Sequence, residues 1–589
     1  MRSGIASIIL IIVGIGSALA HTINDRPTIV RLTKYEIDNL VKSICTDPQS
    51  MNYGGFPRGK EFPYACSRSS IHSGQYLIVG YIYPDFPEYY NSPEMLERIK
   101  MNLDFMKRRQ RENGSIALGT KSVDGSNEVG FTLPGMVETY KRVQQSNVDG
   151  KAEILGALEL YIKKGAQCIR ENFPYTSNHR WAACTGPLAM AHSLFPNPNN
   201  EAFINDYLID GIDIDDKGMY YEECSPNYNS VANWGLSELA DYWGKTDYLK
   251  LIALNLEYQL AMRQPNNEAE TLFSHRQDRG EAHKSWGNYY MYKRLAIETN
   301  NGVFANVADQ KLKEAVNHKH LPKGSIPLLY RFDDEKLQND IVTRQAIPEN
   351  YEIRFDKNPI WRYRTKDVGV TVVADKGGHW WDITQSSWGG LQRSDVFMSY
   401  HFQNAIIDAM RIRWVGGNQS FHPENIEYLS NGSMRLVYVD PGSDHVAHFR
   451  PTEKWGPRHI KGRNQCEVII SHEGEKFKLE ASVTGWEGVH ANIQLLLRED
   501  CTLISPKGKK EKLQCGGETF TTMAGDYILE GPQGHQIKIS GILASQHDSE
   551  LEDNQYIETE ADRHCHKLVM GLFTPVKTTI EFEPIKKEN

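Results

Sequence analysis

The sequence predicts an α+β protein of two structural domains: an N-terminal α/α toroid, which is an incomplete barrel of helices, followed by a C-terminal antiparallel β-sandwich. Two observations predict this order. Up to about residue 318, apolar residues recur three and four positions apart, which is typical of amphipathic helices. Beyond about residue 350, apolar and polar residues alternate with a period of two, which is typical of half-buried strands. At 589 residues the chain is also too long for one ordinary core.

The helical part contains ten predicted segments, each bounded by glycine, proline or polar residues. The segments are 34–43, 71–82, 93–112, 128–145, 150–172, 181–194, 198–211, 230–244, 247–263 and 279–299. Four antiparallel helices would already bury their apolar faces in a bundle, so ten with short connections favour a toroid. We expect this domain to span residues 21–325.

The second part alternates apolar and polar residues between turns rich in glycine, proline, asparagine and aspartate. The predicted strands are 351–355, 369–374, 434–439, 466–471, 477–483, 491–497, 536–543, 568–573 and 578–582. Strands of this number and pattern predict an antiparallel sandwich, which we place at residues 326–589.

Residues 1–20 have the form of a cleavable signal peptide. Arg2 supplies a positive start, residues 8–13 are apolar, and Ala18 and Ala20 form a small-x-small cleavage site. A membrane anchor is the alternative, but the apolar run is shorter than the roughly 20 residues that span a bilayer. We therefore expect a secreted or periplasmic protein.

The net charge of −9 argues against nucleic acid or a membrane surface as a partner. An acidic polysaccharide or oligosaccharide can still bind in a locally basic cleft. Nine cysteines leave at least one outside intramolecular disulfides. Cys501 and Cys515 flank a predicted hairpin, and a disulfide between them is the best candidate.

Residues 177–236 gather the side chains most suited to chemistry. This stretch contains Asn178-His179-Arg180-Trp181, then Tyr228 between Asn227 and Asn229, and then Trp234. Amide, imidazole, guanidinium and phenol groups are costly to bury without partners, so their concentration predicts one wall of a sugar-binding cleft.

The order of domains and these motifs resemble polysaccharide lyases of the heparinase II/III, alginate lyase and chondroitin AC/hyaluronate lyase types. Such lyases carry an Asn or Asn-His pair on the toroid, which Asn178-His179 resembles. They follow it with a segment ending in a catalytic tyrosine, which residues 217–228 resemble with Tyr228 in that position. Lys217 departs from the aspartate that is frequent there. Exo-lyases that release rhamnose from glucuronate in plant gums, the L-rhamnose-α-1,4-D-glucuronate lyases, are one specific candidate.

The resemblance implies β-elimination at a uronic acid, with Tyr228, His179 and Asn178 as catalytic residues. Asn178 and one arginine would neutralise the substrate carboxylate, and the arginine is Arg180, Arg276 or Arg279. Tyr228 alone can move both protons when H5 and O4 lie on one side of the ring. His179 becomes the base when they lie on opposite sides.

The remaining predicted substrate-binding residues are aromatic or carry amides. Trp181 and Trp234 could stack on sugar rings, and Trp181 is the stronger candidate because it lies close to Asn178. Packing between helices is the alternative for both. Asn227 and Asn229 complete the set.

Two other functional classes stay open. A glycoside hydrolase on the same toroid would use paired carboxylates. The stretch offers Asp213, Asp215, Asp216, Glu222 and Glu223. A non-catalytic carbohydrate-binding protein would keep the tryptophans and need neither Tyr228 nor His179.

No cofactor is required for the predicted reaction. Two histidine pairs are compatible with a structural Zn²⁺ or Ca²⁺: His445 with His448, and His564 with His566 around Cys565. With 20 histidines in the chain, such pairs also arise by coincidence.

Overall fold

The computed structural model describes residues 25–58, 62–116, 125–172, 177–221, 226–274, 288–318, 326–334, 337, 340–357, 359–374, 395–414, 420–439, 443–445, 458–460, 464–549 and 564–586. Among these residues, no helix has the length and apolarity to cross a membrane. The predicted signal peptide at 1–20 lies outside them.

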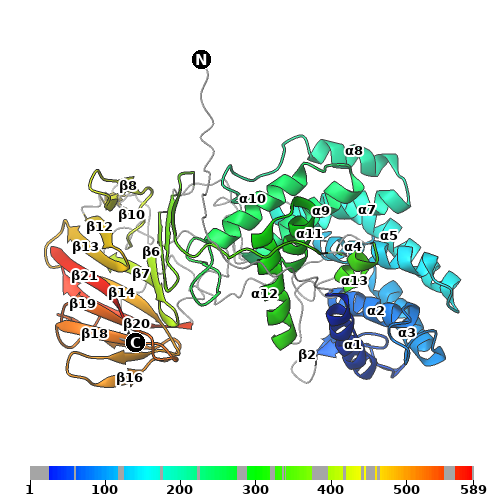
Figure 1. Cartoon of the computed structure of the whole chain (residues 1–589), viewed down its shortest axis with the longest axis horizontal. Coiled ribbons are helices and arrows are strands. Elements are labelled where there is room, and N and C mark those ends of the chain that lie inside the picture. The colour runs from blue at the N-terminus through cyan, green and yellow to red at the C-terminus, as the bar shows by residue number, and fades with distance from the viewer. Residues whose placement is uncertain are drawn as a thin grey trace, which may run out of the picture. The chain divides into compact units, whose positions relative to one another are not determined.

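The predicted order of a helical part followed by a sheet part is confirmed (Figure 1). The helices are α1 (Arg26–Ser43), α2 (Ser67–Ile82), α3 (Pro93–Arg109), α4 (Asn127–Gln145), α5 (Lys151–Glu171), α6 (Ser177–His179), α7 (Gly186–Leu194), α8 (Pro198–Tyr207), α9 (Pro226–Tyr242), α10 (Tyr248–Ala261), α11 (Tyr289–Thr299), α12 (Gly302–His318) and α13 (Ile326–Asp333). A π-helical turn, η1 (Arg180–Thr185), joins α6 to α7. Helix α13 occupies the predicted start of the sandwich, whose first strand begins only at Tyr351.

The chain divides into two compact units, each built from three separate segments. Unit 1 comprises Met1–Met106, Glu138–Leu155 and Asn288–Ile347, and unit 2 comprises Lys107–Val137, Gly156–Gly287 and Pro348–Asn589. Unit 2 therefore holds both the chemistry-bearing stretch and all strands of the sandwich. The domain boundary predicted between residues 325 and 326 stays a prediction.

Unit 1 is stabilised by a buried ion cluster. The Lys293 ammonium lies 2.9 Å from an Asp25 carboxylate oxygen and 2.5 Å from Asp340, and all three side chains are almost completely buried. The Tyr289 hydroxyl donates to Asp25 at 2.6 Å. A buried lysine is tolerated because both carboxylates compensate its charge.

The sandwich in unit 2 consists of two sheets. One sheet has the order β17 (Glu518–Phe520), β20 (Cys565–Phe573), β14 (His490–Arg498), β7 (Ala405–Trp414), β6 (Val396–Phe402), β5 (Val368–Val373), β4 (Ile360–Arg364) and β3 (Tyr351–Phe355). The other has the order β16 (Lys510–Lys512), β15 (Thr502–Ile504), β18 (Gly525–Glu530), β19 (Gln536–Ile542), β21 (Val576–Ile585), β13 (Lys476–Thr484), β12 (Gln465–Glu473), β9 (Met434–Val439) and β8 (Glu427–Tyr428). Neighbouring strands pair antiparallel in both sheets except β17 and β20, which are parallel.

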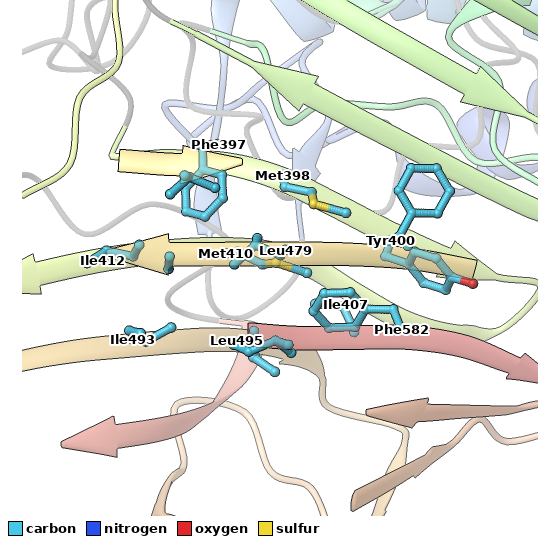
Figure 2. Close-up of a cluster of buried hydrophobic side chains, with 14 of the residues drawn as sticks. Phe397, Met398, Tyr400, Ile407, Met410, Ile412, Leu479, Ile493, Leu495 and Phe582 are labelled. Carbon is cyan, nitrogen blue, oxygen red and sulfur yellow. The ribbon is translucent and has the colours of Figure 1, made fainter. Parts of the chain in front are cut away.

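The core of the sandwich lies between the two sheets. Figure 2 shows Tyr400, Ile407 and Leu495 of the first sheet gathered with Leu479 and Phe582 of the second, and all are buried. Strands β13 and β21 contribute every second residue to this core, so their sequences alternate as predicted.

The first sheet is covered on its other face as well. Phe355, Val396 and Leu496 pack there with Met219, which precedes α9, and Tyr258 of α10. Strand β6 is consequently buried along its whole length, and β7 almost so. Burial on both faces weakens the alternating pattern, and the sequence analysis missed β6 and β7, although it found β5 and β14, which are buried to the same extent.

Buried polar contacts fasten the segment after α10 to this sheet. The Glu270 carboxylate accepts hydrogen bonds from Thr371 and from Ser399 (2.7 Å), and lies 3.9 Å from the Arg362 guanidinium. Farther along, Arg498 donates to Asp408 at 2.6 and 2.8 Å and to Glu268 at 3.2 Å.

The predicted disulfide between Cys501 and Cys515 is wrong, since both residues are thiols. Strands β15 and β16 pair with Thr502 opposite Lys512, and the Leu513 amide donates to the Cys501 carbonyl. Leu513 therefore lies across from Cys501, which is buried, whereas Cys515 is two residues farther on and exposed.

Candidate active site

The Asn178-His179 pair ends a short α-helical turn and precedes the π-helical turn η1. In η1 the Gly186 amide bonds to the Trp181 carbonyl five residues earlier, and the Thr185 hydroxyl donates to the Arg180 carbonyl at 2.8 Å. A π-turn accommodates one extra residue in a helix and occurs often at functional sites. The single helix predicted from residue 181 therefore begins earlier and contains an irregular turn beside the candidate residues.

Helix α9 packs directly on this turn. An added Cβ at Gly235 would lie 2.2 Å from the Trp181 carbonyl carbon, and one at Gly186 would lie 2.5 Å from a Glu238 carboxylate oxygen. Gly235 thus allows the two backbones to touch, and Gly186 leaves room for the Glu238 side chain. Helix α6 packs against α9 too. Asn178 and His179 are thereby held beside the helix whose first turn carries Tyr228.

The three predicted catalytic residues differ in exposure. His179 and Tyr228 are half-buried, and Asn178 is only 2% exposed. The His179 ring lies edge-on to Phe131 of α4, with 5.2 Å between ring centroids. Half-buried rings on rigid helices can meet a ligand in a fixed orientation, as acid–base groups must.

Arg180 is engaged within the protein. Its guanidinium lies 4.8 Å from the Trp181 ring centroid and 5.2 Å from that of Tyr207. It donates to the Tyr207 carbonyl at 3.4 Å and lies 3.8 Å from an Asp210 carboxylate oxygen. These contacts disfavour Arg180 as the arginine that binds a substrate carboxylate.

Trp181 is a packing residue, so the expectation that it stacks on a sugar is wrong. Its side chain has no exposed area, and its indole N–H donates to Asp213 at 2.9 Å. The Arg180 guanidinium lies over the ring, and α9 packs on the Trp181 backbone. Proximity to Asn178 in the sequence could not reveal this, because the burial of a side chain depends on packing in the folded chain, here with Arg180 and Asp213 on the indole.

The other predicted binding residues stay predictions. Trp234 is half-buried and Asn229 is buried. Nothing is described of the Asn227 side chain, and Arg276 and Arg279 lie outside the described residues.

A buried chain of polar groups that the sequence analysis missed supports α9. The Tyr220 hydroxyl donates to Asn233 at 2.7 Å, the Asn233 amide donates to Asn255 at 2.9 Å, and the Asn255 amide donates to the Gly218 carbonyl at 2.7 Å. Gln259 adds a hydrogen bond to Asn255 at 2.6 Å. These hydrogen bonds join α9, α10 and the 218–220 turn. Asparagines at apolar-stripe positions of two neighbouring helices were the signal that could have found it.

The acidic residues of this stretch have structural roles. Asp213 accepts the Trp181 hydrogen bond, and Asp215 accepts the backbone amides of Lys217 and Met219 at 2.9 and 2.8 Å. Burial raises the pKa of Asp215, although these two amides oppose the rise. Asp216 lies 3.5 Å from the Lys357 ammonium at the surface. Glu222 and Glu223 lie outside the described residues. Asp213 and Asp215 therefore support the local structure, and Asp216 pairs with Lys357 at the surface.

No protein-family model and no curated protein sequence matches this chain. Solved structures do match. Heparinase III aligns with a TM-score of 0.53 and 10% identity, over 96% of this chain and 93% of that one. Xanthan lyase from Paenibacillus aligns with a TM-score of 0.56 and 10% identity, over 96% of this chain and 57% of that one. Chondroitin AC lyase from Streptomyces coelicolor, in complex with chondroitin sulphate, aligns with a TM-score of 0.53 and 9% identity, over 95% of this chain and 80% of that one. The likeness shows a shared fold, the predicted α/α toroid followed by an antiparallel sandwich.

Proposed function

We propose that this protein is a secreted polysaccharide lyase that cleaves a uronic-acid-containing glycan by β-elimination and leaves a 4,5-unsaturated uronate. The observation that carries the proposal is the packing of α6, with Asn178 and His179, against α9, with Tyr228. The fold shared with heparinase III, xanthan lyase and chondroitin AC lyase supports the same class.

The first chemical requirement is neutralisation of the substrate carboxylate. The proton at C5 of a uronate is very weakly acidic, and its removal places a second negative charge next to the carboxylate. Donors fixed in advance around that group stabilise the developing charge without reorganising. Asn178 is assigned this role. Because Arg180 is engaged with Trp181 and Tyr207, its arginine partner is Arg276 or Arg279.

Proton transfer is assigned to Tyr228 and His179. In glucuronate, H5 and O4 lie on the same side of the ring, so the Tyr228 phenolate can take the C5 proton and return it to the leaving oxygen. In galacturonate or iduronate they lie on opposite sides. His179 then takes the C5 proton and Tyr228 protonates the leaving oxygen.

The substrate is an acidic polysaccharide or oligosaccharide, and we carry one specific candidate within this class. An L-rhamnose-α-1,4-D-glucuronate lyase would release a terminal rhamnose from glucuronate. Free rhamnose from a rhamnose-capped substrate, without shortening of the main chain, would identify this exo-activity. Falling polymer size would identify internal cleavage.

The deciding experiment follows the ultraviolet absorbance of the unsaturated uronate while purified protein meets glucuronate, alginate, pectic and glycosaminoglycan substrates. Rising absorbance on one of them is expected. New reducing ends without absorbance would overturn elimination in favour of hydrolysis. Binding without any product would favour a carbohydrate-binding protein.

Replacing Tyr228 by phenylalanine removes only the hydroxyl. We expect turnover to fall by about 10²–10⁴-fold, the range for loss of one acid–base group, with an almost unchanged Tm. Tyr221→Phe is the matched control, because Tyr221 is an exposed tyrosine close by in the chain, and it should keep wild-type turnover. Wild-type activity in Tyr228→Phe would refute the assignment.

His179→Gln separates the two stereochemical routes. On glucuronate, where Tyr228 alone moves both protons, the variant should retain most of its turnover. On galacturonate or iduronate it should lose about 10²-fold or more, as a missing general base predicts. Equal losses on every cleaved substrate would contradict the division of roles.

A further inference from the structure

Three side chains with metal-binding atoms converge at one end of the sandwich, outside the candidate active site. Glu499, Cys515 and His564 each offer one such atom, and the carboxylate oxygen, the thiol sulfur and the imidazole nitrogen all lie within 4.8 Å of one another. All three residues are exposed, so an ion could reach them from solvent.

The strand register brings them together. Strands β14 and β20 pair antiparallel up to Arg498 opposite Cys565. The next residue on each side, Glu499 and His564, therefore stands at the same end of this pair. The Gly516 amide donates to the Cys565 carbonyl at 3.1 Å, which delivers the neighbouring Cys515 to the same place. Backbone contacts thus position three ligands from distant parts of the sequence.

Neighbouring donors are engaged elsewhere. The His566 imidazole contacts the Thr519 hydroxyl at 2.8 Å, and Cys565 is buried with its sulfur 3.4 Å from Asp408. His564 precedes β20 and is exposed, whereas His566 is buried in β20 and contacts Thr519. The group of one histidine, one cysteine and one glutamate differs from the histidine pair predicted from the sequence, and that pair stays a prediction.

We propose that Glu499, Cys515 and His564 bind one Zn²⁺. Thiolate, imidazole and carboxylate are the usual ligands of zinc, whereas calcium takes oxygen ligands alone. Three protein ligands leave a fourth tetrahedral position for water. The ion would connect the turn after β14, the turn after β16 and the start of β20. It would stabilise this end of the sandwich, independently of the proposed lyase activity.

The test uses the full-length mature protein after treatment with a chelator and a thiol reductant. Titration with Zn²⁺ should give one bound ion per chain and a rise in Tm. Co²⁺ at the same site should produce the ultraviolet charge-transfer absorbance of a cobalt–thiolate bond. Cys515→Ser should abolish that absorbance, and His564→Gln and Glu499→Gln should weaken Zn²⁺ binding by more than tenfold, because loss of an outer-shell partner alone costs about 10–100-fold.

Cys45→Ser is the matched control, since Cys45 is a half-buried thiol in unit 1. It should bind Zn²⁺ as the wild type does. The Zn²⁺-induced rise in Tm of each ligand variant is measured from the metal-free Tm of that same variant, so that an effect on folding is separated from an effect on binding. No stoichiometric Zn²⁺ in the wild type would overturn the site. Unchanged affinity in the ligand variants, or cobalt binding without thiolate absorbance, would do the same.

Discussion

Single buried amides decide how firmly the candidate active site is held. Asn255 has no exposed area, receives hydrogen bonds from Asn233 and Gln259, and donates to the Gly218 carbonyl. Inside a protein, a polar group left without its partner keeps the whole cost of its desolvation. Asn255 therefore positions α9, and with it Tyr228, without touching substrate.

Asn255→Ala should lower the free energy of unfolding by about 3–5 kcal/mol, since three polar groups lose a partner at about 1–3 kcal/mol each and relaxation recovers part. Denaturant unfolding measures the change. Asn205→Ala is the control: Asn205 is exposed and accepts one hydrogen bond from Trp243. Its expected effect is within about 0.5 kcal/mol. If Asn255→Ala lowers the free energy of unfolding by less than about 1 kcal/mol, the hydrogen bonds of Asn255 do not hold α9 in place.

Among the helices, the crossing of α9 and η1 is the contact on which the site depends. Gly235 allows this crossing, because a Cβ there would lie 2.2 Å from the Trp181 carbonyl carbon. Two backbones cannot move aside as a flexible side chain can. Any larger residue must therefore push α9 away from the Asn178-His179 turn.

Gly235→Ala should destabilise the protein by about 1–3 kcal/mol, as overpacking does. It should also lower turnover by about 10²-fold, because misplacement near 1 Å costs that much. Gly156→Ala in α5 is the control, as an added Cβ there meets nothing within 4 Å. Helix propensity predicts that it stabilises by up to about 1 kcal/mol. Wild-type kinetics in Gly235→Ala would mean that the crossing does not position Tyr228.

The elements divide into those that the sequence could predict and those that it could not. In amphipathic helices, and in strands such as β13, buried residues recur at a fixed spacing along the sequence. The spacing of apolar residues therefore predicts these elements. Strand β6 is buried on both faces and shows no period. For the candidate site, the resemblance selected the stretch containing Asn178 and Tyr228, whose catalytic role stays a prediction. The burial of Trp181 and the role of Asn233 could not be predicted, since both depend on which side chains meet when the helices pack together.

Across unit 2, buried charge ties the segment after α10 to the sandwich and makes its stability depend on pH. Burial acts to raise the pKa of Asp408, but the charge and hydrogen bonds of Arg498 outweigh it and hold the pKa below its ordinary 3.8. A carboxylate with a lowered folded-state pKa contributes stability above its unfolded pKa. That contribution is lost as pH falls through the lower, folded-state pKa.

Arg498→Met should cost about 3–5 kcal/mol at neutral pH, because it leaves the buried Asp408 carboxylate and the half-buried Glu268 carboxylate without their cation. Without Arg498, burial raises the pKa of Asp408 above 3.8. The ionised Asp408 carboxylate then destabilises the folded protein at neutral pH. The variant should therefore recover part of its deficit as pH falls towards 4, where the wild type begins to lose stability. Urea unfolding between pH 3 and 8 measures both curves. A deficit that stays constant across this range would refute the coupling.

The division of each unit among three chain segments also sets an order of events during synthesis. Helices α11, α12 and α13 of unit 1 follow α1 by more than two hundred residues. The buried cluster of Asp25, Lys293 and Asp340 can therefore form only after residue 340 has been synthesised. Contacts this distant in sequence form slowly. Unit 1 therefore cannot be completed on the ribosome before residue 347 has emerged. Until then its first helices expose apolar faces of the kind that chaperones bind.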